Sequence, residues 1–248
     1  MRFKDKVVLV TGAGSGIGQA TSLEFAREGA RVSMVDWNAR NLSETVMMIE
    51  QIECQSMHFA ADVSKADDTK NVVSTTLQKL GRIDILVCNA GIIVPGTVVD
   101  LTEQDMDRML AVNFKGVFLY CKEVIPHMIK QGGGRIVNVS SIGAHRGGRD
   151  RAGYCPTKAA VSLLTRCMAL DHAKDSIFVN AVCPGSVDTG LTRMTFADPL
   201  LRAEKTRIIP TGRFAQPNEI ARVILFLASE DAGYMTGAEV VVDAGLTA

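Results

Sequence analysis

The fold is decided by the stretch Thr11-Gly12-Ala13-Gly14-Ser15-Gly16-Ile17-Gly18. An apolar run at residues 7–10 precedes it and predicts a fully buried strand, and the pattern of residues 19–28 predicts a helix packed on that strand. Backbone N–H groups and the positive end of a helix dipole point at such a turn, and its glycines let a pyrophosphate approach the backbone. The stretch therefore predicts a phosphate-binding turn; the alternative is a tight strand-to-helix turn without a ligand.

An acidic residue follows this turn at the spacing that a dinucleotide site requires. The next apolar run covers residues 30–35 and ends at Asp36. A carboxylate about 20 residues past the glycines suits the two ribose hydroxyls of NAD and would repel the 2′-phosphate of NADP. The alternative for Asp36 is an N-cap of the helix that we predict at residues 38–53. Together, the turn and Asp36 predict that the chain binds NAD.

The composition excludes several classes of protein. The chain has 248 residues and a formal net charge of +0, and it contains no lysine- or arginine-rich run, which argues against nucleic-acid binding. No apolar stretch is long enough to span a membrane, and charged residues lead directly into the first strand, so we expect no signal peptide. The six cysteines are scattered without metal-ligand spacing, which predicts reduced thiols, no metal site and a cytoplasmic location.

Strand and helix patterns alternate through residues 1–248. They predict further strands at residues 57–60, 83–88, 135–139, 177–182 and 239–242, and further helices at residues 66–80, 102–130, 153–174 and 217–229. Pro126 is expected to bend or interrupt the end of its helix. This alternation predicts one α/β domain, a Rossmann-type doubly wound parallel sheet covered by helices on both faces. Ligands of such a sheet bind beyond the carboxyl ends of its strands. These candidate residues stand there: Gly12, Asp36, Asp62, Asn89, Ser140, Ser141 and Pro184.

A tyrosine and a lysine in the helix at residues 153–174 indicate proton-transfer chemistry. Tyr154 and Lys158 are four residues apart and therefore share a helix face. The phenol has a pKa of about 10, and a nearby ammonium together with a cationic nicotinamide would favour its ionised form. Pro156 suits only the first helical turn, which places Tyr154 at the start of the helix. Ser141, at the end of the preceding strand, could hold a substrate oxygen; the alternative is a surface Tyr–Lys pair with a capping serine.

Taken together, these residues resemble the short-chain dehydrogenase/reductase family over essentially the whole chain. The matching motifs are Thr11-Gly12-x-x-x-Gly16-x-Gly18, Asn89-Ala90-Gly91, Asn113, Ser141, Tyr154-x-x-x-Lys158 and Pro184-Gly185. The resemblance implies a doubly wound parallel sheet and an assembly of subunits. We expect a homotetramer, with a dimer as the alternative.

The resemblance also implies a role for each site residue. Tyr154 is the general acid/base, Lys158 binds the nicotinamide ribose and lowers the tyrosine pKa, and Ser141 orients the substrate oxygen. Asn113 kinks its helix and holds a water of the proton relay. The implied cofactor-binding residues are Gly12, Ser15, Gly16, Ile17, Gly18, Asp36, Asp62, Val63, Asn89, Ala90, Gly91, Tyr154, Lys158, Pro184, Gly185, Val187 and Thr189. NADPH-dependent members often carry a basic residue where this chain has Ser15, which also favours NAD.

The substrate is indicated less directly. A lid at about residues 190–210 is expected to close over it, and Arg151 and Arg193 resemble positions in cytosolic-type 3-hydroxybutyrate and sugar-acid dehydrogenases, where arginines bind a carboxylate. Solvated loop arginines are the alternative. We therefore expect hydride transfer between NAD and a secondary alcohol or ketone, with a small hydroxy acid or sugar acid as one candidate. The alternatives are a 3-oxoacyl-(acyl-carrier-protein) reductase and a non-catalytic dinucleotide-sensing protein.

Overall fold

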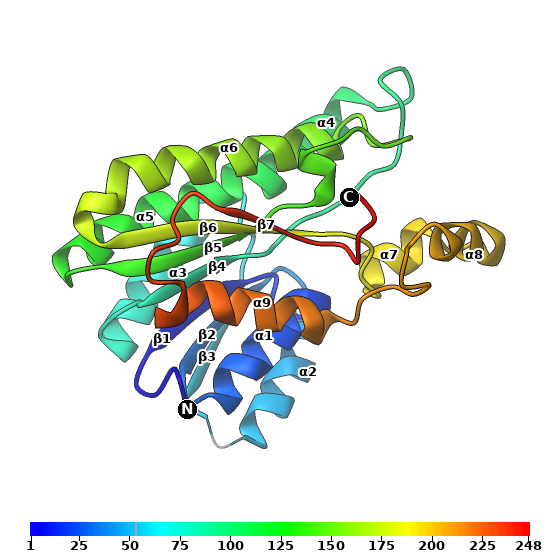
Figure 1. Cartoon of the computed structure of the whole chain (residues 1–248). Coiled ribbons are helices and arrows are strands. Elements are labelled where there is room, and N and C mark those ends of the chain that lie inside the picture. Colours follow the sequence, from blue (N-terminus) through cyan, green and yellow to red (C-terminus); the bar gives the residue numbers. More distant parts are fainter. Residues whose placement is uncertain (53) are drawn as a thin grey trace.

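A parallel β-sheet forms the centre of the molecule. The computed structural model describes residues 1–52 and 54–248, and within them seven strands pair in parallel in the order β3-β2-β1-β4-β5-β6-β7 (Figure 1). The strands are β1 (Val7–Thr11), β2 (Arg31–Asp36), β3 (Ser56–Ala60), β4 (Ile85–Cys88), β5 (Gly134–Val139), β6 (Ile177–Pro184) and β7 (Glu239–Val242). The order reverses beside β1, so the crevice at the carboxyl ends of β1 and β4 is the expected ligand site. The predicted Rossmann-type α/β fold is confirmed.

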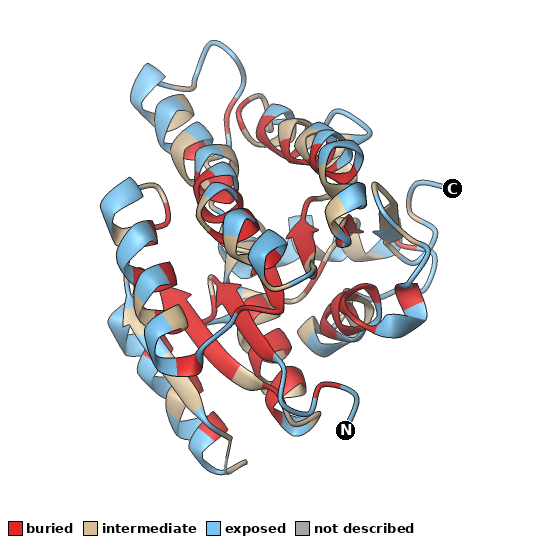
Figure 2. Cartoon of the chain, turned by 90° about the vertical axis from the view of Figure 1, so that its left-hand side faces the viewer, coloured by how far each residue is buried: buried red, intermediate tan, exposed pale blue. Residues whose placement is uncertain are grey.

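Helices cover both faces of the sheet. The helices α1 (Gly16–Arg27), α2 (Ala39–Glu50) and α9 (Pro217–Ala228) lie on one face. The other face carries α3 (Ala66–Leu80), α4 (Glu103–Leu110), α5 (Gly116–Lys130) and α6 (Tyr154–His172). Figure 2 shows the strands buried between the two helical layers, whose outer surfaces are exposed. No helix in residues 1–52 or 54–248 is long and apolar enough to cross a membrane.

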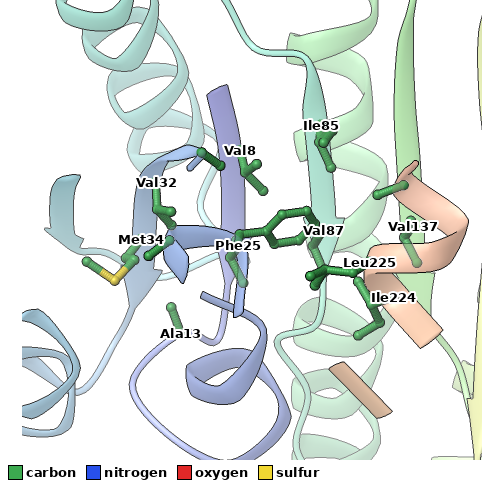
Figure 3. Close-up of a cluster of buried hydrophobic side chains, with 14 of the residues drawn as sticks. Val8, Ala13, Phe25, Val32, Met34, Ile85, Val87, Val137, Ile224 and Leu225 are labelled. Carbon is green, nitrogen blue, oxygen red and sulfur yellow. The ribbon is translucent and has the colours of Figure 1, made fainter. Parts of the chain in front are cut away.

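Each face of the sheet has its own apolar core because neighbouring strand residues point to opposite faces. Val8 of β1 belongs to the core under α1 and α9, whereas the next residue, Leu9, belongs to the core under α3, α5 and α6. In the first core, Phe25 of α1 and Leu225 of α9 lie against the sheet beside Val87 (Figure 3). Burial on both faces explains why the central strands β1 and β4 are continuous apolar runs in the sequence.

Two predicted helices differ from the structure. The helix predicted at residues 102–130 is divided by a π-helical turn, η1 (Ala111–Lys115), between α4 and α5. Pro126 lies inside α5 and does not interrupt it, although proline has no N–H with which to make the i→i−4 hydrogen bond of the helix. The helix predicted at residues 38–53 ends at Glu50 in the structure, and Glu53 lies outside the described residues.

Two short helices occupy the segment that was predicted as a lid. They are α7 (Gly190–Thr195) and α8 (Pro199–Arg207), and they project beyond the body of the molecule (Figure 1). Side chains cap both, because Thr189 accepts a hydrogen bond from the Thr192 amide and Asp198 accepts one from the Leu200 amide. Three short 3-10 turns complete the chain: η2 (Ile142–Ala144), η3 (Ala173–Asp175) and η4 (Glu230–Ala232).

The amino-terminal edge of the sheet is fastened by one buried carboxylate. Asp84, just before β4, accepts a hydrogen bond from the main-chain amide of Val7 at 2.8 Å through Oδ2. Its other oxygen lies 2.7 Å from the Arg82 guanidinium. The amide of Asp84 donates to the Val7 carbonyl at 2.9 Å, so this residue joins β1 to β4 before the ladder between them begins.

Replacing this carboxylate should destabilise the fold. Asp84→Ala leaves the buried Val7 amide without its acceptor, and an unsatisfied buried donor costs about 1–3 kcal/mol. For a chain of this size, about 2–4 °C of melting temperature are lost per kcal/mol, so calorimetry should record a Tm lower by about 2–12 °C. Asp107→Ala, on an exposed face of α4, is the matched control and should stay within about 0.5 kcal/mol of the unmutated protein. Equal melting of the two variants would contradict this account.

Candidate active site

The glycine-rich turn joins β1 to α1 in the geometry that the sequence predicted. Gly12 and Gly16 have φ angles of +66° and +55°, in the left-handed region that glycine adopts without strain. A Cβ atom added to Gly18 would collide with the carbonyl oxygen of Gly12, so α1 packs directly on the turn. Ser15 precedes the helix and makes no capping hydrogen bond with its side chain, while Ile17 packs against the core. The first amides of α1 therefore have no side-chain cap from Ser15.

Asp36 closes β2 beside this turn. Its Oδ2 accepts a hydrogen bond from the Gly14 amide at 2.9 Å, and its Oδ1 accepts one from the Asn38 amide at 2.9 Å. Asn38 and not Asp36 is the N-cap of α2, because its side chain accepts hydrogen bonds from the Arg40 and Asn41 amides. The alternative reading of Asp36 as a helix cap is therefore wrong, and the carboxylate is held against the glycine turn by two backbone amides.

The end of β4 is tied to the same turn. The side-chain amide of Asn89 donates hydrogen bonds to the carbonyl oxygens of Thr11 and Gly12 at 3.0 and 3.1 Å. The hydroxyl of Thr11 accepts hydrogen bonds from the Asn89 and Ala90 amides at 3.0 and 3.2 Å. This hydroxyl was not assigned a role from the sequence, although its place at the end of a strand was the available signal. Gly91 follows, and a Cβ there would lie 3.4 Å from Lys158 Nζ.

Asn113 lies in the π-helical turn and is fully buried. Its Oδ1 accepts a hydrogen bond from the Ile92 amide at 2.8 Å, and its Nδ2 donates to the Ile92 carbonyl at 3.0 Å. Nδ2 also donates to the Thr157 hydroxyl at 3.0 Å, and that hydroxyl donates to the carbonyl of Tyr154 at 2.7 Å. Asn113 thereby connects the strand end after Gly91 to the first turn of α6. Thr157 is a second residue that the sequence analysis missed.

The structure distinguishes the two neighbouring serines after β5. Ser140 is buried, and its hydroxyl donates to the Lys158 carbonyl at 3.0 Å and contacts the Ser162 hydroxyl at 2.9 Å. Ser141 is partly exposed, and its hydroxyl accepts a hydrogen bond from the Gly143 amide at 3.0 Å. The Ser141 hydroxyl forms a hydrogen bond that lowers the pKa of Tyr154, so Ser141 is the serine that lies at the candidate site.

Tyr154 begins α6, and Lys158 lies one turn later with its Nζ 5.9 Å from the centre of the tyrosine ring. Nζ donates a hydrogen bond to the Val139 carbonyl at 2.8 Å, and burial lowers the pKa of Lys158 to about 8. Burial raises the pKa of Tyr154, while a hydrogen bond from Ser141 and the charge of Arg151 lower it. The phenol is therefore protonated at neutral pH in the free protein, and its ionisation depends on what binds beside it.

The predicted adenine-side residues follow β3. Asp62 uses Oδ1 to accept hydrogen bonds from the amide and hydroxyl of Ser64, at 2.9 and 2.7 Å. Val63 is buried, and a Cβ added to Gly116 would lie 3.0 Å from its side chain. Asp62 thus shapes the turn after β3, and Val63 fixes the distance between that turn and α5.

Of the residues predicted at and beyond the end of β6, Thr189 contacts the glycine turn. Pro184 ends the strand, and the Gly185 amide donates to the Val242 carbonyl at 3.0 Å. Val187 is buried and pairs with Ala215 across an isolated bridge. A Cβ added to Gly16 would lie 2.9 Å from the methyl group of Thr189, so the residue that caps α7 contacts the glycine turn. The lid therefore begins at the predicted cofactor site.

The two predicted substrate arginines have different surroundings. The Arg151 guanidinium donates to the Asp150 carbonyl at 2.8 Å, and its charge acts on Tyr154. Arg193 is exposed, and its Nε donates to Asp188 Oδ1 at 3.0 Å. Arg202, which the sequence analysis did not single out, reaches the same oxygen at 3.1 Å. In this conformation the charge of Arg151 acts on Tyr154, whereas Arg193 forms an ion pair with Asp188.

Known proteins resemble this chain along nearly its whole length. A family model described as enoyl-(acyl carrier protein) reductase matches residues 12–247. The chain is 43% identical over 248 residues to a 3-oxoacyl-(acyl-carrier-protein) reductase of Thermotoga maritima, covering 99% of each protein. It is 39% identical over 248 residues to a meso-2,3-butanediol dehydrogenase of Serratia marcescens, covering 100% of this chain and 97% of that protein. The crystal structure of levodione reductase matches with a TM-score of 0.95 at 33% identity, covering 98% of both chains.

The agreement extends over sequence and fold alike. The chain also matches the crystal structure of a short-chain dehydrogenase/reductase candidate from Burkholderia xenovorans. The TM-score is 0.96 at 34% identity, and the match covers 99% of this chain and 98% of that one. With this length of agreement, the chain belongs to the short-chain dehydrogenase/reductase family of oxidoreductases, whose members use a nicotinamide dinucleotide.

Proposed function

We propose that the chain is an NAD-dependent dehydrogenase that transfers a hydride between NAD and a secondary alcohol or ketone. One observation carries the proposal: Ser141, Tyr154, Lys158 and Asn113 converge at the carboxyl edge of the sheet, next to a glycine turn held by Asp36. A dinucleotide-sensing protein would need the turn and Asp36 but would have no use for the complete set of Ser141, Tyr154, Lys158 and Asn113. The six thiols are all free, which supports a reducing, cytoplasmic location.

The glycine turn fits the pyrophosphate of a dinucleotide. No side chain can be added at Gly18 without striking Gly12, so the first turn of α1 presents bare backbone amides. Asp36 keeps lone pairs on both oxygens beyond the two amides that orient it, and these can accept hydrogen bonds from ribose hydroxyls. The 2′-phosphate of NADP would face the buried carboxylate of Asp36, and Ser15 supplies no positive charge to offset that repulsion. These features support NAD over NADP.

The catalytic residues divide the work of alcohol oxidation. When bound, the nicotinamide ring supplies the hydride acceptor. Ser141 donates a hydrogen bond to the substrate oxygen, and Tyr154 removes the hydroxyl proton as the carbon loses its hydride. The Lys158 ammonium binds the ribose and favours the tyrosine's ionised form. Asn113 holds the start of α6 through Thr157 and fixes the backbone at Ile92. The position of the Tyr154 phenol relative to the segment after β4 is thereby fixed.

The alternative enzyme is a 3-oxoacyl-(acyl-carrier-protein) reductase. The Thermotoga maritima relative carries that name at 43% identity, which favours this reading. Other relatives are named for oxidation of small alcohols and sugars, including the butanediol dehydrogenase and a glucose 1-dehydrogenase of Gluconobacter oxydans at 39% identity. Asp36 favours the alcohol and sugar dehydrogenases, since a 3-oxoacyl-(acyl-carrier-protein) reductase would need NADPH. Cofactor preference therefore separates the two functions.

The assembly is proposed to be a homotetramer. Val117 of α5 and Val161 of α6 are buried against the sheet, whereas Phe118 and Leu163 on the same helices are exposed. These outer faces of α5 and α6 can meet a second copy about a two-fold axis. Separate exposed apolar residues lie on α9, on the segment after it and on the edge strand β7, at Phe226, Tyr234 and Val241, and support a second interface. Two such interfaces would give a tetramer rather than a dimer.

Removing the Asp36 carboxylate should weaken discrimination between cofactors. A charge-assisted hydrogen bond contributes about 1.5–3 kcal/mol, so Asp36→Ala should lower kcat/KM with NAD by about 10- to 150-fold and raise the relative rate with NADP. Steady-state kinetics with both cofactors provide the measurement. Asp36→Asn, which keeps the shape and an acceptor for the Gly14 amide, should retain more activity with NAD. Equal catalytic efficiency with NAD and NADP in the unmutated protein would refute NAD dependence.

Removing the tyrosine hydroxyl should abolish most turnover without loss of cofactor. General acid–base groups contribute about 10²- to 10⁴-fold, so Tyr154→Phe should lower kcat by that factor while NAD binding, followed by fluorescence, persists. Tyr234→Phe, at a fully exposed position, is the control. Because burial raises the tyrosine pKa, alcohol oxidation by the unmutated protein should quicken as pH rises toward that pKa. Near-full activity of Tyr154→Phe would show that another group transfers the proton.

The proposed assembly can be tested by light scattering at micromolar concentration. The unmutated protein should have the mass of four chains. Leu163→Glu places a charge on the exposed face of α6 and should shift the mass to two chains, whereas Val99→Glu, at another exposed position, should leave it unchanged. A monomeric mass for the unmutated protein would rule the assembly out.

A carboxylate-bearing substrate is proposed from Arg151, the charge of which reaches Tyr154. A guanidinium can hold a carboxylate through two parallel hydrogen bonds. Arg151→Met should therefore raise KM for a hydroxy acid by about 10- to 150-fold and leave KM for a neutral alcohol of similar size nearly unchanged. Arg193→Met is the comparison variant. Because Arg193 pairs with Asp188, it could bind the substrate carboxylate only after release from that partner. Equal effects of Arg151→Met on both substrates would favour a neutral alcohol.

A further inference from the structure

We propose that His145, Cys183 and Glu239 form a binding site for Zn²⁺. The three residues come from the loop between Ser141 and Tyr154, from β6 and from the first position of β7. Their ligand atoms all lie within 4.8 Å of one another. The sequence analysis expected no metal site because the cysteines lack metal-ligand spacing, and these three residues meet only when the sheet forms.

The distances between the ligand atoms suit a single small ion. His145 Nε2 lies 3.0 Å from Glu239 Oε2, and Cys183 Sγ lies 3.9 Å from the same oxygen. In a tetrahedral zinc site, bonds of about 2.0–2.3 Å separate neighbouring ligand atoms by about 3.3–3.7 Å. The observed separations bracket this range, so small side-chain rotations would seat the ion among the three atoms.

The carboxylate is already oriented for this role. Arg166 of α6 forms an ion pair with Oε1 of Glu239, which leaves Oε2 facing His145 and Cys183. The Glu239 side chain is only 7% exposed, whereas that of His145 is 37% exposed. An ion can therefore enter from the histidine side, while Arg166 holds the other oxygen as outer partners of metal ligands commonly do.

The chemistry of the donors selects the ion. Imidazole, thiolate and carboxylate are the ligands that Zn²⁺ takes, whereas Mg²⁺ and Ca²⁺ prefer oxygen alone. Burial raises the pKa of the Cys183 thiol to about 11, so the thiol is protonated in the free protein. Binding releases that proton to solvent as the Zn–S bond forms, and no electron is transferred. Three protein ligands leave the fourth position to water.

The site would join the substrate loop to the sheet. His145 lies four residues after Ser141, and Glu239 pairs in register with Ala181 of β6. Binding would fix the loop to β6 and β7 together and raise the melting temperature of the protein. The consequence is independent of which alcohol or cofactor the enzyme uses.

Titration of the reduced, chelator-treated full-length protein with Co²⁺ tests the proposal. A thiolate ligand gives Co²⁺ an intense near-ultraviolet charge-transfer band, which nitrogen and oxygen ligands do not produce. We expect this band to saturate at one equivalent of Co²⁺ and to disappear when Zn²⁺ displaces the Co²⁺. His145→Gln should weaken binding by at least about 10-fold, and Cys183→Ala should remove the band. Cys167→Ser, which changes an exposed cysteine of α6, is the control and should keep it.

Two outcomes would overturn the proposal. One is the absence of a thiolate band in the unmutated protein. The other is a band that persists in His145→Gln and disappears in Cys167→Ser, which would assign the metal to the exposed thiol. Because Cys183 is buried, its replacement also tests the stability of the fold, so the variant at the exposed His145 decides the question. Melting with and without Zn²⁺ gives a second readout: the increase in Tm should occur in the unmutated protein and vanish in His145→Gln.

Discussion

The absence of space at Gly18 is the constraint on which the rest of the structure depends. A Cβ atom there would strike the carbonyl of Gly12 and the side-chain amide of Asn89, so β1, β4 and the first turn of α1 meet at one point. Asn89 uses that amide to hold the carbonyls of Thr11 and Gly12. The closeness of the helix to the sheet and the shape of the phosphate turn are therefore one feature. Any residue larger than glycine would disturb both.

A chain of hydrogen bonds extends from the strand end beside this turn to Tyr154. Asn113 joins the backbone at Ile92 to Thr157, and Thr157 joins the carbonyl of Tyr154. The π-helical turn that holds Asn113 places its amide inward, where it is fully buried. Buried polar groups that are all paired fix a single arrangement, because every alternative would leave one of them without a partner. The irregular helix is thus part of the candidate site's architecture.

The sequence predicted those features that depend on neighbouring residues. Buried strands are continuous apolar runs, and the polar residues at their ends necessarily gather at one edge of a parallel sheet, which is how Asp36, Asn89 and Ser141 were found. Composition alone did not reveal the division of residues 102–130, since the π-helical turn has the composition of an ordinary helix, and only the family resemblance implied a kink at Asn113. Contacts between distant segments were also hidden: Glu239 meets His145 across 94 positions of the chain.

The segment predicted as a lid differs from the rest of the molecule in what it contributes to folding. Neither α7 nor α8 buries a single residue, although both are capped by their own side chains. The body holds the lid at its two ends, through Thr189 against Gly16 and through the buried Ile209 and Phe214. Substitutions between those anchors remove little buried area, so mutation can sample them without unfolding the protein. Residues of this segment can therefore change while the candidate site beneath them stays the same, so one fold can accommodate different alcohols.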